Sequence, residues 1–314
     1  MWSLFKNEWI KLWAKKQHWT FAAAIIIIAI FAAFMYGSFA VNDEMQSEDW
    51  RTQMEQEIEQ KEQVLATPDI DDWERDMAEQ IIAENQAHLS SDVNPYLMTN
   101  VKYMNEMLPV IASFITLFSV VAASSIVSSE IQSGTIKQLV IRPFERWQFL
   151  LSKFLTVTVF SLLLVIILIV SNYVISTLLF GNGDWTAQAP MHNGNEASYV
   201  TLIFSQMGLY TLNMLVFVVI SFSLSTLFKS QALAVGIGIF VLFFTNMTQM
   251  LTMVLGDTAW YKFVILPHLS LPQYTYTNTI MEGVTLPFSL AVLAVYVIIF
   301  LSITTVFFQK RDIA

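Results

Sequence analysis

Long uncharged apolar runs alternate with short charged segments along most of this chain. A helix needs about 20 apolar residues to cross the hydrocarbon core of a bilayer, and six runs are that long. We expect transmembrane helices at residues 19–41, 107–129, 154–180, 199–228, 230–256 and 287–308. The pattern therefore predicts an all-α integral membrane protein with six transmembrane helices.

An amphipathic segment precedes the first span. Its apolar positions recur at helical spacing and form one stripe: Trp2, Phe5, Trp9, Leu12 and Trp13. Glu8, Lys11 and Lys15 fall on the opposite face, which we expect to meet water. Tryptophan favours the boundary between headgroups and hydrocarbon, so residues 1–18 are predicted to be an interfacial helix on the membrane surface. A soluble helix packed against a partner is the alternative.

Residues 42–106 are the one sizeable polar loop. Two sets of apolar residues at intervals of four occur in it, offset by 23 positions: Trp50, Met54 and Ile58, then Trp73, Met77 and Ile81. Residues four apart share a helix face, and Thr67-Pro68 marks a turn between the sets. The loop is therefore predicted to be a hairpin of two amphipathic helices, with stripes that face each other or the headgroups. Its 17 acidic and four basic residues favour a solvated ectodomain over a surface that concentrates cationic molecules.

The composition agrees with a membrane protein. Hydrophobic residues make up 55% of the chain and charged residues 13%, and the mean hydropathy is +0.55, outside the usual range of soluble proteins. The chain has no cysteine, which excludes disulfides and thiolate metal sites. His192 and His268 lie in loops without a partner at ligand spacing, so we expect neither a metal site nor a cofactor on this chain.

The distribution of lysine and arginine predicts the orientation. With both termini inside, the inner segments hold 11 of the 16 basic residues: Lys6, Lys11, Lys15, Lys16, Lys137, Arg142, Arg146, Lys153, Lys229, Lys310 and Arg311. Positive charge accumulates on the cytoplasmic side. We therefore expect a multi-pass protein of the plasma membrane with both termini cytoplasmic, a cytoplasmic segment at 130–153 and a cytoplasmic tail at 309–314. The outer segments are then 42–106, 181–198 and 257–286, the last being extracellular or re-entrant.

The predicted spans lack ionisable side chains at depth. Secondary transporters and proton pumps couple ion gradients through such groups, so that class is disfavoured. Amides occur instead, and Asn213, Asn246 and Gln249 are candidates for a substrate path, although buried amides more often hydrogen-bond between helices. The chain also lacks the G-x-x-x-x-G-K-[ST] phosphate loop. Energy for transport would therefore have to come from a separate chain.

The cytoplasmic segment between the second and third spans has the punctuation of a short helix. It carries Glu130, Gly134, Thr135, Leu139, Val140, Pro143 and Arg146, followed by Lys153. Gly134 permits a tight backbone approach or a positive φ where the second span ends, and Thr135 suits the N-cap of a following helix. Pro143 would end that helix.

The same segment carries groups suited to docking. Leu139 and Val140 would fill an apolar groove on a partner, and Glu130, with Arg142 or Arg146, would form the polar rim of the contact. The alternative is a turn that only shapes the inner loop and anchors it to headgroups. We favour docking, because an anchor has no need of the Gly-Thr and Pro punctuation.

The pattern E-x3-G-T-x3-L-x3-P-x2-R of this segment resembles the inner loop of type-2 ABC-transporter permeases. The order of six spans after an interfacial helix is similar to that family over nearly the whole chain. The resemblance implies that this segment includes a coupling helix, with the residues of the pattern in the contact to an ABC ATPase subunit. It also implies a complex of two permease chains, as a homodimer or heterodimer, with two ATPase chains that carry ATP and Mg.

The function that the resemblance implies is ATP-driven transport, most simply export of a drug, peptide or lipid-like substrate. The chain itself would then be no enzyme and would have no nucleic-acid partner. The runner-up is a non-transporting membrane sensor or anchor with a ligand-binding ectodomain.

Overall fold

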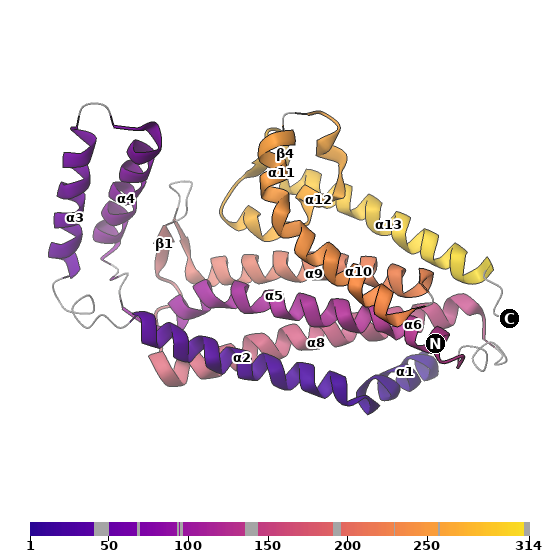
Figure 1. The fold of residues 1–314 in the computed structure, drawn as a ribbon. Helices are drawn as coiled ribbons and strands as arrows, with labels where there is room; N and C mark the ends of the chain where they lie inside the picture. Colours follow the sequence, from indigo (N-terminus) through magenta and orange to yellow (C-terminus); the bar gives the residue numbers. More distant parts are fainter. Residues whose placement is uncertain are drawn as a thin grey trace. The chain divides into compact units, whose positions relative to one another are not determined.

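The computed structural model is drawn as a ribbon in Figure 1. It describes residues 1–40, 50–67, 70–92, 94, 97–135, 144–190, 196–228, 230–256 and 258–310. The chain forms two compact units. The first consists of Met1–Ala29, Leu108–Ser171 and Gln206–Ala314, and the second of Ile30–Met107 and Asn172–Ser205. Helices dominate both units.

Five helices of the described chain are long and apolar enough to cross a membrane. They are α2 (Lys16–Ala40), α5 (Asn100–Ile126) with its extension α6 (Ser128–Gln132), α8 (Arg146–Phe180), α9 (Tyr199–Leu227) and α13 (Leu286–Lys310). Helix α13 exposes Val295, Ile298 and Ile303, as a helix facing lipid would. The prediction of an all-α, multi-pass membrane protein is confirmed at this level.

The predicted span 230–256 is interrupted. Helix α10 (Gln231–Phe244) ends at a 3-10 turn, η1 (Thr245–Met247), and α11 (Thr248–Leu255) follows. Helix α10 has 14 residues, so it is roughly 21 Å long and by itself falls short of the hydrocarbon thickness. Hydropathy does not predict this break, and neither proline nor glycine occurs at it.

The N-terminal segment is helical, as predicted. Helix α1 (Trp2–Ala14) is separated from α2 by Lys15, whose backbone is extended. A ladder of aromatic rings continues across this junction, with neighbouring centroids 4.7 to 6.0 Å apart: Trp2, Phe5, Trp9, Trp13 and Trp19. The Trp19 indole also donates a hydrogen bond to the Trp13 carbonyl oxygen at 3.0 Å. The ladder thus fixes the direction in which α1 leaves α2.

Helix α1 packs on the protein through a second face. Leu4, Glu8 and Leu12 are its buried residues, and Leu4 contacts Phe149 of α8. The expectation that Glu8 faces water is therefore wrong. In the aromatic stripe, Trp2 is 76% exposed and Phe5, Trp9 and Trp13 are half-buried.

The acidic loop forms the predicted helical hairpin, α3 (Trp50–Leu65) and α4 (Asp72–Ser91), which lie side by side in Figure 1. Trp50 and Met54 of the first set are buried. Their counterparts Trp73 and Met77 are 71% and 48% exposed, so the two stripes do not face each other as one prediction had it. Helix α4 instead buries Ala78 and Asn85.

Polar contacts fix the remainder of the second unit. Asn100 at the start of α5 donates to Thr177 Oγ1 at 2.9 Å and accepts from Gly183 N at 2.8 Å. The Tyr103 hydroxyl donates to Asn172 Oδ1 at 3.2 Å. A short antiparallel strand pair, β1 (Gln188–Pro190) and β2 (Glu196–Ser198), follows α8. The sequence pattern did not predict these strands.

The first unit is built on close contact between α5–α6 and α9. A side chain from α9 enters the backbone ladder where α5 passes into α6: Ser225 Oγ accepts from the amides of Val127 and Ser128, both at 3.0 Å. Insertion of a side chain into the i→i−4 ladder is a known cause of such a break. Small residues at this contact allow the two backbones to approach each other.

Helix α10 approaches α5 just as closely through Gly238. A Cβ atom at this position would lie 2.7 Å from Ser124 Oγ and 3.0 Å from Val120 Cγ1, too near for a real carbon. Gly236, two residues earlier in the same helix, has nothing within 4 Å of its Cβ position. The pair separates the effect of crowding from the effect of glycine on the helix backbone.

We expect Gly238→Val to destabilise the protein by about 1–3 kcal/mol, because overpacking forces α10 away from α5. Gly236→Val changes the same helix with the same residue type and is the matched control, expected to leave the melting temperature within a degree or two or to raise it. Thermal unfolding of both variants in detergent measures the difference. Equal melting temperatures would contradict the crowded contact.

The segment between α11 and α13 consists of short elements rather than one irregular loop. It contains η2 (Tyr261–Phe263), α12 (Ile265–His268), η3 (Leu271–Thr275) and the strand pair β3 (Thr279–Met281) and β4 (Val284–Thr285). His268 is fully buried within it. Its Nε2 lies 3.0 Å from the Lys262 carbonyl oxygen, and its Nδ1 lies 2.7 Å from Ser289 Oγ.

The partners of His268 define its tautomer. A carbonyl oxygen only accepts, so Nε2 carries the proton and Nδ1 accepts from the Ser289 hydroxyl. Ser289 Oγ in turn lies 2.6 Å from the Tyr274 hydroxyl. Burial lowers the pKa of His268, which keeps the ring neutral in this arrangement. His268 thus ties the segment between α11 and α13 to the start of α13.

Candidate functional site

The first of the predicted coupling residues, Glu130, lies in α6, and Gly134 and Thr135 follow the end of that helix. Gly134 has a φ of 72°, which confirms the predicted positive φ, and nothing lies within 4 Å of its Cβ position. The requirement for glycine here is therefore conformational rather than steric. The Thr135 hydroxyl donates to the Glu130 carbonyl oxygen at 3.4 Å and lies 2.9 Å from Ser133 Oγ. These bonds close the turn at the end of α6.

The rest of the coupling motif is described only in part. Leu139, Val140 and Pro143 lie outside the described residues, so their roles stay predictions. Arg146 is the first residue of α8, and its Nη1 donates to the Gln309 carbonyl oxygen at 3.0 Å. This bond joins the start of α8 to the end of α13.

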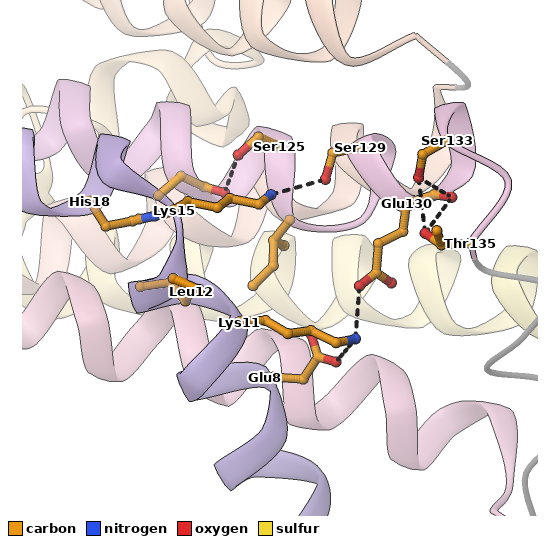
Figure 2. A pocket seen from close by; sticks show the side chains of 13 residues that line it. Glu8, Lys11, Leu12, Lys15, His18, Ser125, Ser129, Glu130, Ser133 and Thr135 are labelled. Carbon is orange, nitrogen blue, oxygen red and sulfur yellow. Dashed lines mark hydrogen bonds and ion pairs between the residues drawn. The ribbon is translucent and has the colours of Figure 1, made fainter.

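A cluster of four charges, Glu8, Lys11, Glu130 and Lys153, joins both ends of segment 130–153 to α1. Lys153 Nζ lies 2.6 Å from Glu8 Oε2 and 2.7 Å from Glu130 Oε2. Lys11 Nζ lies 2.9 Å from Glu8 Oε1 and 3.3 Å from Glu130 Oε1; Figure 2 shows Lys11 between the two carboxylates. Each carboxylate thus has two ammonium partners, and the cluster is neutral.

The four charged side chains differ in burial, and Glu8 and Lys153 form the most buried pair. The side chains of Lys153 and Glu8 are 3% and 5% exposed, that of Glu130 is 16% exposed, and that of Lys11 is 42% exposed. Burial alone would raise the pKa of Glu8, but the Lys153 ammonium, with help from Lys11, outweighs it and lowers the pKa below its usual 4.5. The stability that Glu8 contributes is therefore present above pH 4.5 and is lost as the pH falls below it.

The sequence pattern predicted other surroundings for these residues. Glu8 and Lys11 were expected to face water, and Glu130, with Arg142 or Arg146, was expected in the polar rim of a docking contact. In the structure Glu130 pairs with Lys153 and Lys11. One signal was present in the sequence: Leu4, Glu8 and Leu12 are four apart, so Glu8 lies on an apolar line of α1. No local pattern names its partner, which lies 145 residues away.

A cavity of about 500 Å³ adjoins the charge cluster (Figure 2). It lies between the junction of α1 with α2 and the C-terminal end of α5–α6. Its polar lining consists of Glu8, Lys11, Lys15, His18, Ser125, Ser129, Glu130, Ser133 and Thr135, and its apolar lining of Leu12, Ala14, Ala122 and Ile126. Lys15 Nζ reaches Ser129 Oγ at 3.5 Å.

A second cavity of about 410 Å³ contains one of the predicted substrate-path residues, Asn213. It lies among α5, α9, α10 and residues 269–273. The Asn213 side chain is nearly buried, and its Oδ1 has no hydrogen-bond partner among the described residues. The side chains of Asn246 and Gln249 lie outside what the structure describes, so their place in a substrate path stays a prediction.

The fold defines a multi-pass α-helical membrane protein with a buried charge cluster at one end of its spans. The chain belongs to the family described as "Protein of unknown function (DUF2705)", whose profile matches residues 81–314. The uncharacterized protein YhcI of Bacillus subtilis (strain 168) is 29% identical over 328 residues, which cover 100% of both chains. The uncharacterized membrane protein YdbK of the same organism is 30% identical over 199 residues, 62% of this chain and 76% of YdbK.

Proposed function

We propose that this protein is the membrane-spanning permease subunit of an ATP-driven ABC exporter, coupled to a separate ATPase chain. In this proposal it lies in the plasma membrane with both termini cytoplasmic and has six spans, with α10 and α11 as an interrupted fifth. Two permease chains, as a homodimer or heterodimer, bind two ATPase chains that carry ATP and Mg. The transported molecule is a drug, peptide or lipid-like substrate.

The ion pair between Glu130 and Lys153 is the observation that carries the proposal. These two residues flank the cytoplasmic segment, and their 2.7 Å contact holds its two ends together. Lys153 also binds Glu8 of α1 at 2.6 Å. A displacement of the segment by an ATPase would therefore be transmitted to α5–α6, α8 and α1 together, and would not be confined to the segment itself.

The cavity around Asn213 supports a transport function. Its lining combines hydroxyl and amide groups with aromatic rings and contains no ionisable acid or base other than the Tyr210 phenol: Ser113, Phe114, Thr116, Leu117, Tyr210, Asn213, Phe217, Leu242, Phe243, Thr245, Leu269, Ser270, Pro272 and Gln273. Mostly apolar cavities with a few polar groups are typical of small-molecule sites. Such a lining suits a neutral or amphipathic substrate better than a small ion.

Purification from the native host tests the proposal. We expect the tagged chain, extracted in mild detergent, to co-purify an ABC ATPase in equal amount. Vesicles containing the pair should hydrolyse ATP and move a member of a panel of fluorescent drugs, peptides and lipids, and a protonophore should leave transport unchanged. Energy must come from the ATPase because the chain has neither a phosphate loop nor ionisable groups at the centre of its predicted spans.

Vesicles with this chain alone are the control and should show neither ATP hydrolysis nor substrate transport. Gradient-driven flux through the isolated chain would replace the proposal with a secondary transporter. A complex that contains a kinase and no ATPase would favour the sensor or anchor instead.

A further inference from the structure

The cavity beside the charge cluster has one more ammonium group than is required to neutralise its carboxylates. Glu8 and Glu130 are both held by Lys153 and Lys11. Lys15 forms no ion pair with any carboxylate in the described part of the chain, and its ammonium group reaches only as far as Ser129 Oγ at 3.5 Å (Figure 2). An anion placed in the cavity would therefore meet an ammonium group that is free to bind it.

The electrostatic setting of Lys15 favours the same kind of ligand. Loss of hydration lowers the pKa of Lys15, and the positive charges of Lys153 and Lys11 lower it further, against the opposing effect of Glu130 and Glu8. A bound anion would relieve this penalty, because an opposite charge within a few Å stabilises an ammonium ion. The Ser129 hydroxyl, which lines the same cavity and accepts from Lys15, supplies a further donor.

The aromatic ladder of α1 places this cavity at the level of lipid headgroups. Trp2 and Trp19 at its two ends are 76% and 62% exposed, and tryptophan side chains concentrate at the membrane interface. Lys15 immediately precedes α2, whose span begins at Lys16. The cavity thus opens where a span enters the bilayer, and Leu12, Ala122 and Ile126 give it an apolar wall as well.

We propose that this cavity binds the phosphate group of an anionic phospholipid, with Lys15 and Lys11 on the phosphate oxygens and the Ser129 hydroxyl as an additional donor. The apolar wall would take the glycerol backbone and the start of an acyl chain. The proposal rests on the membrane fold and not on the transport function. Ser133 and Thr135 lie at the start of the segment 130–153. A bound lipid would therefore contact α1, α5 and the start of that segment at once.

Lipid binding to the full chain in a neutral detergent tests the proposal. The probes are dioctanoyl phosphatidylglycerol, dioctanoyl phosphatidylcholine and inorganic phosphate, each titrated while native mass spectrometry counts the bound molecules. We expect one phosphatidylglycerol to bind saturably and ahead of phosphatidylcholine. Lys15→Gln should weaken that binding roughly tenfold, the loss of one charge-assisted hydrogen bond.

Three controls decide the outcome. Lys6→Gln removes an exposed lysine of α1 that does not line the cavity, and it should leave the affinity unchanged. Lys15→Arg keeps the charge and should keep binding, and it also serves if Lys15→Gln fails to fold. An equal loss in Lys6→Gln, equal binding of the two lipids, or inorganic phosphate binding as tightly as phosphatidylglycerol would each overturn the proposal.

Discussion

Replacing Lys153 by methionine is expected to lower the free energy of unfolding by about 3–5 kcal/mol, the cost of leaving buried carboxylates without their partner. Methionine keeps most of the lysine volume, so the loss reports charge rather than a cavity. Glu8 would suffer most, because its side chain is 5% exposed and its shortest ion pair, at 2.6 Å, is with Lys153. Thermal unfolding in detergent and the yield of folded protein from membranes measure the effect.

Two further variants test the assignment of that loss. Lys11→Met removes the cation whose side chain is 42% exposed and should cost no more than about 1 kcal/mol, as exposed ion pairs do. Glu8→Gln added to Lys153→Met should restore part of the stability, because it removes a buried charge that lost its partner. If Lys153→Met and Lys11→Met were equally stable, or if Glu8→Gln lowered stability further in the Lys153→Met background, the buried cluster would not hold the fold as described.

The sequence predicted the elements of this fold better than their contacts. Spans such as α8 and α13 were predictable from long uncharged runs. A long apolar helix without charged side chains is surrounded by lipid or by other spans. The positive φ of Gly134 was likewise predictable, because it depends on one residue and its neighbours. The interruption at Thr245–Met247 was not, because hydropathy measures polarity and not the hydrogen bonds of each turn.

Contacts between distant residues were beyond the sequence for a physical reason. Periodicity shows which residues share a helix face but not what that face meets. Trp50 and Trp73 occupy equivalent positions in their helices, yet one is buried and the other exposed. The cluster of Glu8 and Lys153 has the same origin: each residue alone resembles a solvated charge, and only the packing of α1 on α8 makes them a buried pair. In the candidate site, the conformation of Gly134 was therefore predicted from the sequence, whereas the buried pair of Glu8 and Lys153 was not.

Under the proposed function, replacing Leu139 by aspartate is expected to abolish co-purification of the ATPase while the protein itself stays folded in the membrane. The reason is that a carboxylate cannot enter an apolar groove without losing its hydration, a penalty of several kcal/mol that no partner in such a groove offsets. This expectation rests on the proposed function and on the motif, since Leu139 lies outside the described residues. The measurement is the amount of ATPase recovered per permease after mild detergent extraction.

Stability and docking can be separated because Leu139 and Lys153 should fail in different ways. Leu139→Asp should keep the melting temperature of the unmodified protein and lose the ATPase, whereas Lys153→Met should lower the melting temperature whether or not an ATPase is present. Arg142→Ala, which removes a charge from the expected rim of the contact, should reduce ATPase recovery only slightly. If Leu139→Asp instead disappears from the membrane, the residue belongs to the fold of the permease, and the docking role of the segment must be given up.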